Sequence, residues 1–142
     1  MVRKDLKYTQ EHEWVRMEAP QPSGPSAPSG GGHVAVIGIT DYAQKALGDI
    51  TYVELPQVGT KLQQGKEFAV AESAKAASDV FAPVSGAVAE VNSSLADHPE
   101  LINQDPYGEG WLVRVTGVSA GEVASLLSPQ EYEKLIAAEE SG

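Results

Sequence analysis

The sequence predicts a mainly β fold with a few short helices. Apolar residues alternate with smaller ones around Phe68 and Val70, and the run 86–91 has a similar pattern, which is typical of half-buried strands. Proline and glycine residues separate these runs with turns. The segments 58–65 and 83–91 also echo each other weakly, as two sheet halves related by an approximate twofold axis would.

The first predicted hairpin joins a strand at 12–16 to a strand at 33–38. Between them, the segment 17–32 (MEAPQPSGPSAPSGGG) is the only low-complexity stretch of the chain. The 16 residues before it are too few to form their own core, so the first strand must return across this stretch to pair with the second. We therefore expect 17–32 to be a long, disordered hairpin connection.

A short helix is predicted over 41–47. Thr40 is a favourable N-cap, Asp41 suits the positive end of the helix dipole, and Gly48 can end the helix. A strand over 50–55 follows and is ended by a proline. A turn then leads to the strand that precedes residue 75.

The chain is predicted to end in a helix over 128–138. Ser128 and Glu131 have the spacing of a capping box, with Pro129 at the first helical position. Three apolar side chains give this helix a face that can pack on the core. They are Tyr132, Leu135 and Ile136. Residues 139–142 are expected to fray.

The composition fits one globular domain spanning residues 1–142. With 42% hydrophobic and 21% charged residues, the chain can form one modest core, and a second domain is not expected. The longest apolar runs are short and broken by charges, and the amino terminus lacks the apolar stretch of a secretory signal. We expect a monomeric cytoplasmic protein with no membrane partner.

The chain is acidic, with a formal net charge of -10 and a pI near 4.6. This charge argues against nucleic acid as a partner, because phosphates select basic surfaces. It suits transient binding of basic proteins, although it would serve solubility equally well. The chain has no cysteine, so any thiol or redox chemistry must be carried by a group added to it.

Lys75 is the strongest candidate for a functional residue. It lies in the segment 72–79 (ESAKAASD), at an expected exposed bend between two predicted strands. Most surface lysines are simply solvated. Here, however, alanine and serine neighbours leave room for an enzyme to reach the amine, and ion pairs with Glu72 or Asp79 would contribute little. The segment therefore has the form of an attachment site.

This segment resembles the lipoyl-attachment hairpin of the glycine cleavage system H-protein family. Further matches follow in the family's order. They are 8–14 (YTQEHEW), 38–44 (GITDYAQ), 48–50 (GDI), 53–56 (VELP) and 103–111 (NQDPYGEGW). Collinear matches over nearly the whole chain are far more specific than one motif. The resemblance implies a barrel-sandwich hybrid, the flattened barrel of lipoyl and biotinyl domains, with a C-terminal helix.

The resemblance implies that lipoate is the cofactor, attached as an amide to Lys75. The carrier would take the aminomethyl group of glycine from glycine decarboxylase (P protein) and pass it to aminomethyltransferase (T protein). Dihydrolipoyl dehydrogenase (L protein) would then reoxidise the arm. A lipoate ligase, or a lipoyl or octanoyl transferase, would attach the arm, and Glu72 and Asp79 would help it to recognise the hairpin.

The resemblance also implies a pocket that shelters the loaded arm. Acidic groups would suit the bound amine, and we expect Glu13 and Asp79 to supply them, with Glu11 as a weaker third candidate. An ordinary exposed carboxylate is an equally good interpretation of Glu13. Family members often place a histidine in the helix after the Thr40–Asp41 pair. In this chain the corresponding region is 44–47 (QKAL), so the usual pocket histidine near Ala46 is missing.

Three alternatives to this interpretation remain. A biotinyl or lipoyl domain of another multienzyme complex is disfavoured, since biotin domains usually have methionines where Ala74 and Ala76 flank the lysine. A lipoate relay would use the same lysine but pass the lipoyl group itself to other proteins, and sequence does not separate it from the carrier. A hydrolase using Glu11, His12 and Glu13 is the alternative from another class, but we expect no enzyme.

No metal site is predicted. His12, His33 and His98 are too scattered for a ligand set and are expected at the surface. Trp14 and Trp111 are expected to pack in the core, as large aromatic residues in strands usually do, although Trp111, which follows 108–110 (GEG), could instead reach a partner surface.

Overall fold

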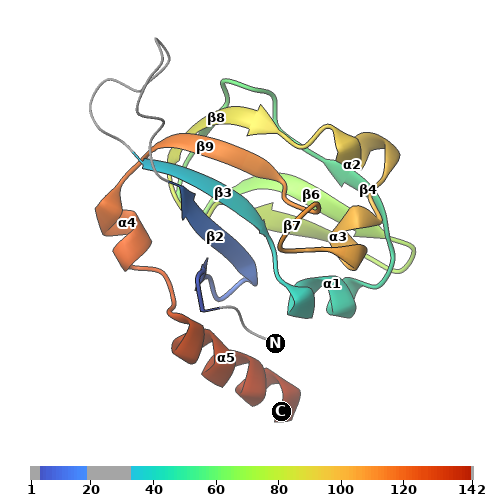
Figure 1. Cartoon of the computed structure of the whole chain (residues 1–142). Coiled ribbons are helices and arrows are strands. Elements are labelled where there is room, and N and C mark those ends of the chain that lie inside the picture. The colour runs from blue at the N-terminus through green and yellow to red at the C-terminus, as the bar shows by residue number, and fades with distance from the viewer. Residues whose placement is uncertain (1–3, 19–32, 142) are drawn as a thin grey trace.

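The structure is a computed structural model that describes residues 4–18 and 33–141 (Figure 1). It consists of a six-stranded and a three-stranded antiparallel sheet, with short helices around them. The order of strands in the larger sheet is β1 (Lys7–Tyr8), β2 (Glu13–Glu18), β3 (His33–Ile39), β9 (Val113–Val118), β8 (Gly86–Val91) and β5 (Lys61–Leu62). The smaller sheet contains β4 (Ile50–Glu54), β6 (Glu67–Ser73) and β7 (Ala77–Phe81). The helices are α1 (Asp41–Leu47), α2 (Ser94–Asp97), α3 (Leu101–Gln104), α4 (Ala120–Ala124) and α5 (Pro129–Ser141).

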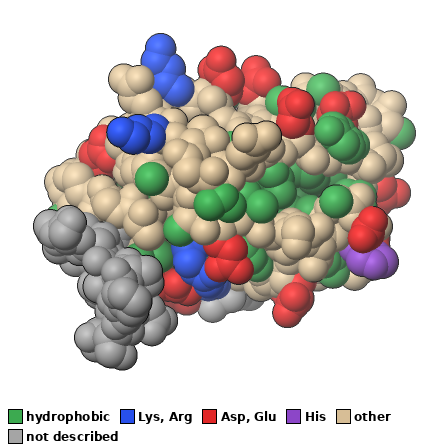
Figure 2. Space-filling view, turned by 90° about the horizontal axis from the view of Figure 1, so that it is seen from above, with side chains coloured by type: hydrophobic (Ala, Val, Ile, Leu, Met, Phe, Trp, Pro, Cys, Tyr) green, Lys and Arg blue, Asp and Glu red, His purple; other side chains and the backbone are tan. Residues whose placement is uncertain are grey.

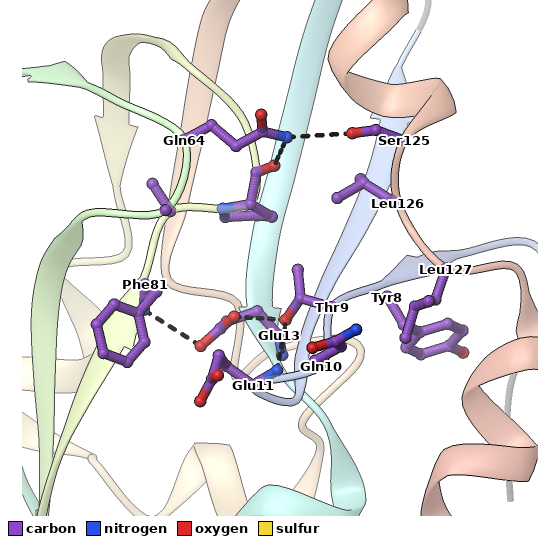
Figure 3. A pocket seen from close by; sticks show the side chains of 13 residues that line it. Tyr8, Thr9, Gln10, Glu11, Glu13, Gln64, Phe81, Ser125, Leu126 and Leu127 are labelled. Carbon is purple, nitrogen blue, oxygen red and sulfur yellow. Dashed lines mark hydrogen bonds between the residues drawn. The ribbon is translucent and has the colours of Figure 1, made fainter.

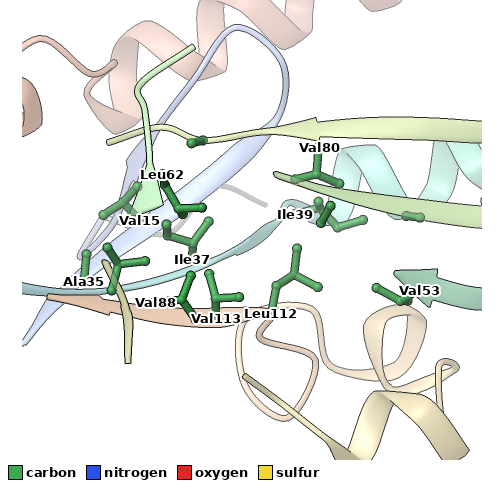
Figure 4. Close-up of a cluster of buried hydrophobic side chains, with 14 of the residues drawn as sticks. Val15, Ala35, Ile37, Ile39, Val53, Leu62, Val80, Val88, Leu112 and Val113 are labelled. Atoms are coloured by element: carbon green, nitrogen blue, oxygen red, sulfur yellow. The ribbon is translucent and has the colours of Figure 1, made fainter. Parts of the chain in front are cut away.

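The main core lies between the two sheets (Figure 4). Ile37 and Val113 contribute to it from the larger sheet, and Val53 and Val80 from the smaller one, all with less than a tenth of their surface exposed. Every second residue of a strand faces the same side, so this layer follows from the alternation in the sequence. The predicted mainly β fold is confirmed.

A second, smaller cluster holds α5 against the larger sheet. The rings of Tyr8 and Tyr132 are stacked with centroids 4.4 Å apart, and Trp14 is fully buried beside them. Trp14 needs Gly38 on the facing strand, because a β-carbon there would lie 2.6 Å from the indole ring. Trp111 is half-buried next to this cluster rather than in the main core.

The hairpin of β2 and β3 forms as predicted, but its first strand is longer than expected. Met17 and Glu18 continue β2 and pair with Ala35 and Val34. The predicted loop 17–32 therefore begins two residues too early, and the rest of it lies outside the described residues.

The helix caps agree with the sequence at three ends. Thr40 accepts a hydrogen bond from the amide of Ala43, and Gly48 ends α1 with a φ of 87°. The capping box of α5 forms reciprocally: the Ser128 amide donates to the Glu131 carboxylate (2.8 Å), and the Glu131 amide donates to the Ser128 hydroxyl (3.2 Å).

Two predicted boundaries differ from the structure. The strand predicted over 50–55 ends at Glu54. The helix predicted to end at 138 continues through Ser141, past the residue where we expected fraying to begin, and residue 142 lies outside the described residues. A contact from another part of the chain explains the extension, because the Glu139 carboxylate lies 3.1 Å from Nε2 of His12. None of the described helices combines the length and the apolar character needed to cross a membrane.

Candidate functional site

Lys75 lies at the tip of the hairpin formed by β6 and β7. The strands pair antiparallel up to Glu72 and Ala77. Ser73 closes the turn, since its amide donates to the carbonyl of Ala76 (2.7 Å) and its hydroxyl accepts from the Ala76 amide (3.2 Å). Lys75 is exposed in this bend, as the sequence predicted.

The Lys75 side chain lies beside the carboxyl end of α1. A β-carbon added at Gly48 would be 3.4 Å from Cε and 3.9 Å from Nζ of Lys75. These are ordinary van der Waals distances, so the lysine stem is a close neighbour of Gly48, and it is the φ of 87° that favours glycine there. Within residues 4–18 and 33–141, no hydrogen bond or ion pair engages the Lys75 amine.

Asn103 fixes the turn that supports this end of α1. Its amide nitrogen donates to the side-chain oxygen of Gln44 (2.8 Å) and to the carbonyl of Gly48 (2.9 Å). Its amide oxygen accepts from the backbone N–H of Ile50 (2.8 Å). The sequence did not identify Asn103 as a supporting residue, and its place at the start of the 103–111 motif was the only available signal.

Glu72 and Asp79 flank Lys75 on one face of the smaller sheet. Glu72 is opposite Ala77, and Asp79 is opposite Val70, so the two acidic side chains are diagonal neighbours on the same face. Diagonal neighbours in an antiparallel pair are roughly 7–8 Å apart. Asp79 is exposed and Glu72 is half-buried.

A pocket of about 420 Å³ lies between the β1–β2 turn, the end of β7 and the segment that leads into α5 (Figure 3). Glu11 and Glu13 line it, together with apolar groups such as Phe81 and Leu126. Two of the three predicted pocket acids are thus brought together. Asp79 is not among the lining residues; it lies on β7, between Lys75 and Phe81.

Glu13 is buried rather than exposed, with 2% of its surface accessible. The Thr9 hydroxyl donates to one carboxyl oxygen at 2.5 Å, and the Phe81 amide donates to the other at 3.2 Å. β7 is the edge strand of its sheet, so Glu13 satisfies an amide that has no strand partner. The interpretation of Glu13 as an ordinary exposed carboxylate is therefore wrong.

Burial also changes the ionisation of Glu13. Desolvation raises the pKa of its carboxyl to about 7, against the opposing effect of the hydrogen bonds from Thr9 and Phe81. The nearby charge of Glu11 raises the pKa further. At neutral pH the pocket therefore holds a carboxyl group that a cationic ligand could shift to its ionised form.

The segment 44–47, where the resemblance would place a histidine, has none. Ala46 is exposed on α1. Gln44 is buried and donates to Asp41 (2.8 Å) while accepting from Asn103, so its amide serves the structure of the turn.

His12 is not the surface histidine that the sequence predicted. Its side chain is 16% exposed, and its two ring nitrogens lie 2.8 Å from the Tyr132 hydroxyl and 3.1 Å from the Glu139 carboxylate. It also has a φ of 72°, a conformation that costs a non-glycine residue on the order of 1–3 kcal/mol. His98, in contrast, has an exposed side chain, and the His33 side chain lies outside the described part of the molecule. Among the described residues, no group of three or more histidine or acidic side chains could hold a metal ion.

A two-sheet domain that presents a lysine at a hairpin bend has the architecture expected of lipoyl-carrier domains. The family model described as "Glycine cleavage H-protein" matches residues 6–139. Among similar proteins, the glycine cleavage system H protein of Carboxydothermus hydrogenoformans is 49% identical over 142 residues, covering 100% of this chain and 98% of the relative. That of Rubrobacter xylanophilus is 48% identical, covering 98% of both chains.

A solved structure agrees with these relatives. The crystal structure of a glycine cleavage system H protein from Mycobacterium marinum superposes with a TM-score of 0.79 at 38% identity, covering 96% of this chain and 99% of the other. The chain therefore belongs to the glycine cleavage H-protein family.

Proposed function

We propose that this chain is the lipoyl-bearing carrier of a glycine cleavage system, with lipoate attached to Nζ of Lys75. It acts as a monomeric, single-domain cytoplasmic protein without enzymatic activity of its own. It carries the aminomethyl group from glycine decarboxylase to aminomethyltransferase, and dihydrolipoyl dehydrogenase restores its oxidised form. The observation that carries this proposal is an exposed lysine at a hairpin tip in a chain of this family.

The surroundings of Lys75 fit an amide-linked lipoyl group. The amine is accessible, and the small residues Ala74 and Ala76 on either side are exposed, so an attaching enzyme meets no bulky neighbour in the bend. The amide forms when the neutral amine attacks an activated lipoyl acyl group, loses a proton and displaces the activating group. When attached, the dithiolane ring supplies the redox and carbon-carrying chemistry that a chain without cysteine cannot provide.

We assign recognition by the attaching enzyme, a lipoate ligase or a lipoyl or octanoyl transferase, to Glu72 and Asp79. Their carboxylates share one face beside the lysine, and a basic surface on the enzyme could contact both. Figure 2 shows acidic side chains spread over one face of the molecule, with a patch of hydrophobic side chains between them. The acidic surface suits partners that bind and leave repeatedly, because charge attraction speeds encounter.

We further propose that the loaded arm rests in the pocket lined by Glu11 and Glu13. From Ala77 to Phe81, β7 spans roughly 13 Å at about 3.3 Å per residue, and this strand leads from the lysine to the pocket. Asp79 lies on the same strand and would contact the arm on its way. A bound amine would favour the ionised form of Glu13, so binding would replace part of the solvation that the buried carboxylate lacks.

Reconstitution with the other three components of the system tests the carrier role. Lipoylated wild-type protein should support glycine decarboxylation, and so should Lys66→Arg, which changes another exposed lysine. Lys75→Arg should support none. A pure lipoate relay would accept lipoate on Lys75 yet fail to support decarboxylation, and streptavidin binding by the modified protein would indicate a biotinyl carrier instead.

Enzymatic activity is tested separately with the unmodified protein. Turnover that survives Lys75→Arg and disappears in His12→Ala would contradict the carrier proposal and favour a hydrolase built on the β1–β2 turn.

A further inference from the structure

The turn between β1 and β2 has an unusual backbone at the residue between its two acidic side chains. His12 has a φ of 72°, and among the described residues it is the only non-glycine with positive φ. The turn is closed by Thr9, whose hydroxyl accepts from the amides of Glu11 (3.3 Å) and Glu13 (3.1 Å). Glu11 and Glu13 thus project from a turn whose shape depends on the conformation of residue 12.

The side chain of His12 is held by elements far away in the sequence. Nδ1 lies 2.8 Å from the Tyr132 hydroxyl, and Nε2 lies 3.1 Å from the Glu139 carboxylate, so α5 binds both ring nitrogens. The ring also lies against Tyr42 of α1, with centroids 4.6 Å apart. On the backbone, the His12 carbonyl accepts from the Thr40 amide at 3.0 Å.

The hydroxyl of Tyr132 continues this chain of hydrogen bonds. It lies 2.7 Å from the hydroxyl of Thr40, which caps α1. One connected set of side chains therefore joins α5, the strained turn and the N-terminus of α1. A residue keeps a strained backbone conformation only where several contacts hold it there, and such residues cluster at functional sites.

We propose that His12 is a positioning residue for Glu13. The bonds from its ring to α5 hold residue 12 in the left-handed conformation, and this conformation directs the Glu13 carboxyl to the Phe81 amide and the pocket. α5 thereby stabilises the shape of the pocket, although no residue of α5 lines it. This inference concerns how the pocket is built; only the identity of the group that the pocket binds rests on the proposed function.

The unmodified full-length protein tests this inference by NMR. The titration of the Glu13 side-chain carboxyl is followed with ¹³C-labelled glutamate, and the exchange of the Phe81 amide with solvent reports whether the Glu13 bond persists. In wild type the Glu13 midpoint is expected at about 7, with a protected Phe81 amide.

Two substitutions of one residue separate backbone conformation from side-chain contact. His12→Ala keeps a β-carbon but loses both anchors, so the turn should relax, the Glu13 midpoint should move down toward 4.5, and the Phe81 amide should exchange at least tenfold faster. His12→Gly adopts positive φ without strain, so it should retain a midpoint near the wild-type value.

The inference is overturned if His12→Ala titrates and exchanges like wild type. It is also overturned if the Glu13 midpoint and the Phe81 exchange rate change as much in His12→Gly as in His12→Ala. The backbone conformation of residue 12 would then not be what positions Glu13. Tyr132→Phe serves if His12→Ala does not fold: it keeps the ring stacked on Tyr8, removes one anchor, and should shift the midpoint in the same direction by a smaller amount.

These measurements need no lipoyl arm. They can therefore fail while the carrier proposal holds, and they can succeed even if Lys75 carries nothing.

Discussion

Replacing Glu13 by glutamine removes an ionisation in the pocket that burial opposes. The pKa of this carboxyl is about 7 in the folded protein, compared with a reference value of 4.5 that we take for the unfolded chain. Between these two pH values the folded state holds a proton that the unfolded state has released. The contribution of Glu13 to stability is therefore complete below pH 4.5 and is lost as the pH rises through about 7.

The size of the effect follows from the two values. At roughly 1.4 kcal/mol per pH unit, the rise from 4.5 to about 7 corresponds to about 3 kcal/mol. The free energy of unfolding of wild type should fall by an amount approaching this figure, relative to Glu13→Gln, between pH 4 and pH 8. Glutamine also loses one acceptor for the Thr9 and Phe81 donors, but that loss is constant with pH and does not alter the slope.

Urea denaturation at a series of pH values measures this difference. Glu54→Gln is the matched control, because Glu54 is an exposed carboxylate at the end of β4 and should leave the pH dependence near that of wild type. Parallel curves for wild type and Glu13→Gln would refute the reasoning, since they would mean that folding does not change the ionisation of Glu13.

Three further substitutions test the supporting structure by urea denaturation. Gly38→Ala places a β-carbon 2.6 Å from the Trp14 ring and should cost about 1–3 kcal/mol; a neutral result would show that the two strands can separate. Ser128→Ala removes the cap of α5 and should cost about 1 kcal/mol, whereas an unchanged midpoint would mean that packing alone fixes the start of the helix. Asn103→Ala removes three hydrogen bonds and, at roughly 1 kcal/mol each, should cost about 3 kcal/mol and speed exchange of the Ile50 amide; retained protection of that amide would contradict its role in the turn.

The features that the sequence predicted well depend on neighbours along the chain. Thr40 and Ser128 cap their helices through contacts three residues away, and the bend at Lys75 follows from the two strands on either side of it. Such local preferences are visible in a short window of sequence.

The features that the sequence did not predict depend on distant contacts. Glu13 is buried because it satisfies the amide of Phe81, 68 residues away, and His12 is anchored by Tyr132, 120 residues away. Neither pairing can be predicted from the neighbouring residues, because the segment around His12 and Glu13 has the polar composition of an exposed turn. The extension of α5 has the same cause, since Glu139 gains its partner from that turn.

Intact mass spectrometry tests the central claim most directly. The protein is coexpressed with a lipoate ligase, with lipoate supplied, and the mass of each variant is compared with that of the unmodified chain. Wild type and the control Lys66→Arg should each gain one lipoyl group per chain, and Lys75→Arg should gain none. A lipoyl increment that persists in Lys75→Arg, or that never appears in wild type, would contradict the assignment of Lys75 as the attachment site.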